Sequence, residues 1–124
     1  ADRGKPEGEP LIRLAGSMAT LRGIIISYPE WSQNDVPPVP YPPTVKAEHN
    51  DNAAILDCLF LNSYEAIYLD FAGRFLVRNV YGYPSYRGIS VDQCYDIGRI
   101  ENVHFWPFIS NRHFASRLSR SLLP

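Results

Sequence analysis

The stretch Val77–Gly82, with the sequence Val-Arg-Asn-Val-Tyr-Gly, decides the fold because the chain repeats its pattern three more times. Each copy has an aliphatic residue, a charged residue, a small residue or Asn, and an apolar-any-apolar triplet. The other copies are Leu21–Ile26, Leu56–Leu61 and Ile100–Phe105. Self-similarity at a period of roughly 20–25 residues, with strand-like alternation inside it, is typical of a β-solenoid.

A second pattern of alternating apolar residues falls between these copies, at Ile12–Leu14, Val45–Glu48, Ile67–Asp70 and Ile89–Asp92. The two patterns together predict three short strands in each turn of an all-β fold, with about four coils. Alternation then places one set of side chains in a central aliphatic core. Within Leu56–Leu61 it points Leu59 and Leu61 inward and Phe60 outward.

Corners between the second and third strand of each coil are predicted at Asn79 and Asn102. Asn tolerates left-handed backbone conformations and bonds to nearby amides. Stacked Asn side chains could also pair with one another from coil to coil. Gly23 and Cys58 are expected at the equivalent corner in the earlier coils.

A chain of 124 residues is expected to form one domain, residues 11–108. Residues 1–10 are a polar tail. Residues 29–43 are a proline-rich loop, since Pro cannot donate to a strand ladder. Residues 109–124 are a C-terminal tail in which Phe114, Leu118 and Leu122 have helical spacing, so a short amphipathic helix is expected to cap the last coil.

Composition narrows the function. The formal net charge of -1 argues against a nucleic-acid partner, which usually requires a basic surface. No apolar run reaches the length of about 18 residues needed to span a bilayer, so no membrane partner is expected. A start at Ala1 fits a processed secreted protein or a fragment of a longer one. The two cysteines are expected to be small buried thiols.

Three carboxylates are predicted on adjacent coils of the first sheet: Glu48, Asp70 and Asp92. Paired carboxylates suit glycoside hydrolysis, one as acid and the other as base or nucleophile, so these three are the candidate catalytic residues. Beside them we expect a substrate-binding set, made of Lys46, Tyr68, Ser90 and Arg87. The sequence predicts no cofactor, but the same column could hold Ca²⁺, and Lys46 or Arg87 would then serve as the base of a β-elimination. A solvated face neutralised by Lys46, Arg74 and Arg87 is the alternative.

The third predicted sheet carries large apolar and aromatic groups that face outward. Such a patch is normally covered, by a tail, by another chain or by a stacked sugar ring. The candidate interface residues are Phe60, Tyr81, Tyr83, His104 and Trp106.

The segments Gly73-Arg74, Tyr86–Ile89, Val91-Asp92 and Cys94–Pro107, with Thr20–Gly23 and Tyr28–Glu30, carry a family resemblance. The chain between Leu11 and Phe108 resembles the pectate-lyase and polygalacturonase-like superfamily of right-handed parallel β-helix proteins. The resemblance implies a secreted, extracellular protein and a polysaccharide as partner. The paired-Asp motif of the polygalacturonases is not intact, so the resemblance assigns no catalytic residue.

Three functions follow as hypotheses. The first is a secreted carbohydrate-active domain that binds or cleaves an acidic polysaccharide by hydrolysis or by elimination. The second is a structural protein that self-associates into an oligomer or an extracellular filament. The third is a fragment of a longer enzyme whose catalytic residues lie elsewhere.

Overall fold

The computed structural model describes residues 3–106, which contain nine β-strands and no helix. Three of the strands are very short and lie before the proline-rich loop. The other six follow it and have six to nine residues each. The strands are β1 (Ile12–Leu14), β2 (Thr20–Arg22), β3 (Ile25–Ile26), β4 (Val45–Asp51), β5 (Ala54–Phe60), β6 (Glu65–Gly73), β7 (Leu76–Gly82), β8 (Arg87–Asp92) and β9 (Arg99–Phe105).

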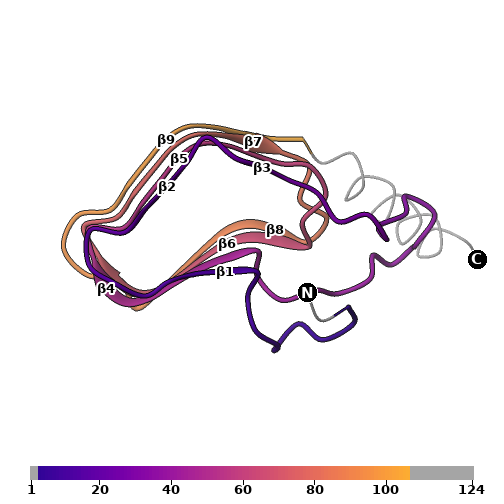
Figure 1. Ribbon diagram of the computed structural model, residues 1–124, viewed down its shortest axis with the longest axis horizontal. Coiled ribbons are helices and arrows are strands. Elements are labelled where there is room, and N and C mark those ends of the chain that lie inside the picture. The colour runs from indigo at the N-terminus through magenta and orange to yellow at the C-terminus, as the bar shows by residue number, and fades with distance from the viewer. Residues whose placement is uncertain (1–2, 107–124) are drawn as a thin grey trace, which may run out of the picture.

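The strands form two sheets, and the chain alternates between them. One sheet has four strands in the order β1-β4-β6-β8, and the other has five, ordered β2-β5-β7-β9 with β3 also paired to β5. All recorded strand pairs are parallel. Figure 1 shows the sheets as two layers, with β1, β4, β6 and β8 in one and the remaining strands in the other.

The predicted β-helix is wrong. We expected a right-handed parallel β-helix of about four coils with three strands in each, but residues 3–106 form two parallel sheets and no third one. The physical reason lies at the expected corners. Asn79 and Asn102 do adopt left-handed backbone conformations, but β7 and β9 run on through them as single strands. The second and third predicted sheets are therefore one bent sheet. The expected C-terminal helix lies outside the described residues.

Side-chain hydrogen bonds stabilise this bend. The residues at the bend are Gly23, Asp57, Asn79 and Asn102, each with a positive φ. Asn102 Nδ2 donates to Asn79 Oδ1 over 2.8 Å, and Asn79 Nδ2 donates to Asp57 Oδ1 over 2.9 Å. The predicted Asn pairing is confirmed, but Asp57 stands at the position expected for Cys58.

The core lies between the two sheets and is largely aliphatic. In the four-stranded sheet the predicted register and inward residues are confirmed, for instance Ala47 beside Leu69 and Val45 beside Ile67, all four fully buried. In β5 the prediction was shifted by one residue. Ile55 and not Leu56 pairs with Val77, and Phe60 and not Leu61 pairs with Gly82. Since strand side chains alternate, this shift exchanges the two faces of β5.

The proline-rich loop is anchored to the start of the four-stranded sheet. The ring of Tyr41, which is buried, meets the ring of Tyr28 edge-on, with centroids 4.6 Å apart. The Tyr28 hydroxyl bonds to Thr44 Oγ1 over 2.8 Å, and Thr44 donates to Ser63 Oγ over 2.8 Å. These paired hydroxyls allow polar groups to be buried at the strand ends without loss of hydrogen bonds.

Candidate functional site

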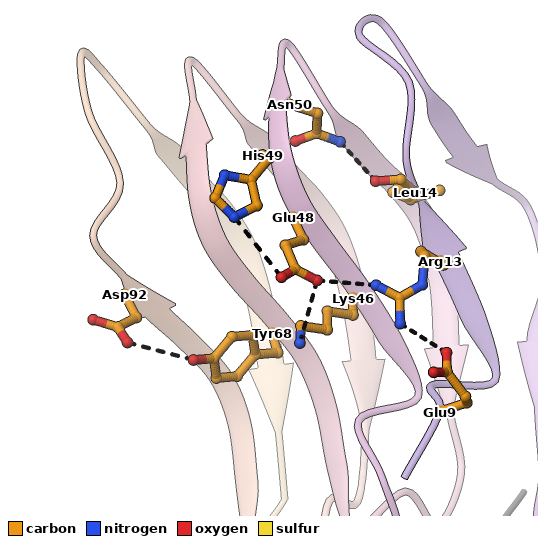
Figure 2. Close-up of polar contacts among 9 residues, drawn as sticks. All are labelled: Glu9, Arg13, Leu14, Lys46, Glu48, His49, Asn50, Tyr68 and Asp92. Atoms are coloured by element: carbon orange, nitrogen blue, oxygen red, sulfur yellow. Dashed lines mark hydrogen bonds and ion pairs between the residues drawn. The ribbon is translucent and has the colours of Figure 1, made fainter. Parts of the chain in front are cut away.

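The outer face of the four-stranded sheet collects most of the predicted catalytic and substrate-binding residues. Strand register aligns Lys46, Tyr68 and Ser90 in one column. The same register aligns a second column of carboxylates. That column contains Glu48, Asp70 and Asp92. The predicted columns are therefore present, and Figure 2 shows part of this face.

Glu48 is neutralised by cations. Its Oε2 lies 2.9 Å from Arg13 Nη1 and 3.4 Å from Lys46 Nζ, as Figure 2 shows. The charge of Lys46 is the main cause that holds the pKa of the Glu48 carboxyl below its usual range. A carboxylate with a lowered pKa is a poor general acid at neutral pH. Glu48, at one end of the carboxylate column, therefore forms an ion pair with Lys46 of the neighbouring column.

Asp70 and Asp92 stand side by side without such neutralisation. Parallel strands lie about 4.8 Å apart, so the backbones of these two residues are close. Neither carboxylate has a cation within ion-pair distance among residues 3–106. The Tyr68 hydroxyl donates to Asp92 Oδ2 over 3.4 Å. Burial, followed by the charges of Asp70 and Asp92, raises the pKa of Tyr68 and keeps this phenol protonated as a donor.

Arg87 does not join this group. It pairs in register with Glu65 at the start of β8, five residues before Asp92, and its guanidinium lies 4.7 Å from the ring centre of Tyr86. At about 3.3 Å per residue the strand places it roughly 16 Å from Asp92. The structure therefore does not bring Arg87 to the carboxylate column as a base.

A small hollow of about 160 Å³ lies at the same end of the sheet, where Lys46, Glu65 and Tyr68 meet the segment Pro6–Gly8. Glu65 is almost completely buried, and its Oε1 has no hydrogen-bond partner in the part of the chain described. An ordered water is the simplest partner for such an atom. Sequence reasoning missed Glu65, since in the alternating pattern it occupies a core position.

The outer face of the five-stranded sheet carries the aromatic residues. The rings of Tyr83 and Trp106 stack with centroids 5.1 Å apart, and His104 stacks on Trp106 at 4.0 Å. Tyr81 pairs in register with His104. Tyr83 and Trp106 each keep 37% of their surface exposed. Three of the five predicted interface residues thus form one exposed ring cluster, and Tyr81 lies beside His104 with partial exposure.

Phe60 is the exception and corrects the prediction. Its side chain is fully buried in the core, because the true register of β5 points it inward. The neighbouring position, Leu59, takes its place on the outer face beside Tyr81.

Two hollows lie on this same outer face along the bend. One measures about 510 Å³ and the other about 530 Å³. The first is lined by the bend residues and by Ile25, Leu59 and Tyr81. The second is lined by Leu76, three arginines and two acids. The arginines are Arg74, Arg78 and Arg99, and the acids are Asp96 and Glu101.

The arginines of the second hollow differ in their partners. Arg74 is neutralised, with Nη1 2.5 Å from Asp96 and Nη2 3.5 Å from Asp51. Arg78 and Arg99 make no ion pair or side-chain hydrogen bond with any residue between 3 and 106. Two guanidinium groups are therefore free to bind an anion. The sequence already indicated that Arg78 and Arg99 point outward, because each is the neighbour of an inward residue, Val77 and Ile100 respectively.

Metal binding has little support in the described part of the chain. Residues 3–106 contain no group of three or more His, Cys, Asp or Glu side chains placed to hold a metal ion.

A search of the same residues for a helix that is long and apolar enough to cross a membrane finds none.

Comparisons with protein-family models, with curated proteins and with solved structures find no match to this chain.

Proposed function

We propose that the protein binds an acidic polysaccharide across the outer face of the five-stranded sheet, as an extracellular carbohydrate-active domain. The observation that carries this proposal is the exposed stack of Tyr83, Trp106 and His104 on the same face as the hollows of about 510 Å³ and 530 Å³. Exposed aromatic rings provide an apolar surface on which a sugar ring packs. The face is also continuous across several strands, as an extended ligand requires.

Polar groups beside the rings fit the hydroxyls and carboxylates of such a ligand. The bend residues Asp57, Asn79 and Asn102 border the first hollow with amide and carboxylate groups. Arg78 and Arg99 border the second, and a guanidinium binds a carboxylate through paired N–H groups. Together these features favour an acidic sugar over a neutral one.

Binding is proposed in preference to cleavage because the candidate groups for each lie on different sheets. Asp70 and Asp92 are on the four-stranded sheet, whereas the rings and free arginines are on the five-stranded one. A glycan chain held by the rings is therefore not presented to this carboxylate pair.

The test is a titration calorimetry series with oligogalacturonates and with neutral oligosaccharides of equal length. We expect Trp106→Ala and Tyr83→Ala each to weaken binding roughly 10-fold, the loss of about 1.4 kcal/mol that one stacked ring supplies. Arg78→Gln should weaken binding of the acidic ligand only, and added salt should do the same.

Tyr86→Ala is the matched control. Tyr86 is also an exposed aromatic residue, but it lies in the link between β7 and β8 and stacks on Tyr64. Its removal should leave affinity unchanged. If the ring variants bind as tightly as the parent protein, or if no oligosaccharide binds, the proposal fails.

A further inference from the structure

One end of the two sheets exposes residues that belong to the core by position. β8 and β9 are the last strands in their sheets. Val91 pairs with fully buried Leu69, and Ile100 with fully buried Val77, yet Val91 and Ile100 are each 48% exposed. Ile97, in the link between these strands, is 69% exposed. The inward columns therefore end in an open apolar surface.

The opposite end begins the same columns with matching residues. Leu14 starts the column that ends at Val91, and Leu21 starts the column that ends at Ile100. An outward column runs from Arg22 through Leu56 and Arg78 to Glu101, so it starts with a positive charge and ends with a negative one. The apolar columns thus reach the β1–β3 end, where Leu14 is 7% exposed and Leu21 is partly buried, and the charged column has opposite signs at its two ends.

Nothing in Figure 1 lies across the layers at the β1–β3 end. The view looks along the direction in which the strands are stacked, and residues 3–10 and the proline-rich loop lie beside the two layers. Every strand pair is parallel, so a second copy in the same orientation would continue both sheets with the same hydrogen-bond pattern.

We propose that the protein self-associates head to tail, the β8–β9 end of one copy pairing with the β1–β3 end of the next. The contact would pair the free N–H and C=O groups of the edge strands and bury Val91, Ile97 and Ile100. It would also set Glu101 of one copy beside Arg22 of the next. Because the two contacting surfaces differ, the assembly does not close at two copies and grows into linear oligomers.

Sedimentation velocity of the full chain over a concentration series tests the proposal. We expect the mean mass to rise beyond a dimer with concentration. Glu101→Arg should weaken association roughly 10-fold, since it places two positive charges in contact with one another across the interface. Arg22 is not inverted in this test, because within its own copy it already pairs with Asp57 at 3.0 Å.

Two further variants test whether association uses the β8–β9 end or another part of the surface. Ile97→Lys should abolish association, whereas Leu61→Lys, at an exposed aliphatic position on an inner strand connection, should not change it. Tyr83→Ala should weaken saccharide binding roughly 10-fold and still associate, so the two proposals fail separately. Circular dichroism melting of each variant confirms that it is folded.

Three outcomes would overturn the proposal. A monomer at all concentrations would mean that another occupant, such as residues 107–124 or a different partner, covers the β8–β9 end. A mass that stops at a dimer would indicate contact between like ends. Unchanged association of Glu101→Arg would exclude the Arg22–Glu101 contact.

Discussion

Asp57 adopts a left-handed backbone conformation in the middle of β5, and its carboxylate is held by two neighbours. It accepts hydrogen bonds from Asn79 Nδ2 at 2.9 Å and from Arg22 Nε at 3.0 Å. The bond from Asn79, followed by that from Arg22, lowers the pKa of Asp57. A carboxyl whose pKa is lower in the folded state than in the unfolded state stabilises the fold above the unfolded pKa of about 3.9. That stabilisation is lost as the pH falls through the folded pKa.

The variant Asp57→Asn tests this linkage. It keeps an oxygen for the Asn79 bond but removes the charge. We expect its melting temperature to lie below that of the parent protein at about pH 6, and the gap to shrink as the pH falls below about 3.9 and through the lower pKa of the folded state. The melting-temperature gap between Arg22→Gln and the parent protein should depend on pH less strongly than that of Asp57→Asn, because the hydrogen bond from Asn79 to Asp57 remains. A gap that is constant across this range would contradict the assignment.

At the scale of the strand, β5 shows how one position decides which side chains form the core. Ile55, Cys58 and Phe60 point inward and are buried, while Leu56 and Leu59 lie on the outer face and are partly exposed. Gly82 makes room for this arrangement. A Cβ on Gly82, whose φ is 153°, would collide with the Phe60 backbone carbonyl. The pairing of Phe60 with Gly82 is therefore sterically selected.

Two alanine substitutions measure this register. Phe60→Ala should lower the free energy of unfolding by about 3–5 kcal/mol, the usual range for a buried ring that leaves a cavity. Leu59→Ala, one position away on the outer face, should lower it by much less. Urea unfolding of the two variants makes the comparison, and a larger loss for Leu59 would mean that β5 is shifted by one residue.

At the scale of the whole molecule, the two sheets present outer faces of different chemistry. One carries Glu48, Asp70 and Asp92 among polar residues. The other carries the rings of Tyr83 and Trp106 and the free Arg78 and Arg99. Since the core lies between the sheets, a substitution on one outer face should not alter ligand binding on the other.

The variant Asp92→Asn tests this separation. We expect it to bind oligogalacturonates with the affinity of the parent protein, because the carboxylate pair lies on the opposite sheet from the rings. Turnover of the same oligosaccharides, followed by reducing-end release and by absorbance of an unsaturated product, should be absent in both proteins. Cleavage by the parent that is lost in Asp92→Asn would instead assign catalysis to the carboxylate face.

Several features of the site followed from the sequence because they depend on local periodicity. The columns of Lys46 with Tyr68 and of Asp70 with Asp92 follow from alternation and from the spacing of the repeats. Ion pairing does not follow from periodicity. Arg13 and Glu48 are 35 residues apart, and only strand pairing brings them to 2.9 Å. For this reason Glu48, one of the three carboxylates expected to be catalytic, is part of an ion pair.

The sequence by itself determined that the chain forms parallel strands in a repeating order, because apolar alternation and repeat length specify which segments pair. Tertiary structure alone decided the number of sheets and the inward face of β5. Asn79 and Asn102 are compatible with a corner or with a bend, and only their stacked side chains and unbroken strands select the bend. Ile55 and Leu56 are adjacent and equally apolar, so alternation cannot distinguish them, and only the folded structure shows that Phe60 is buried with its carbonyl close against Gly82.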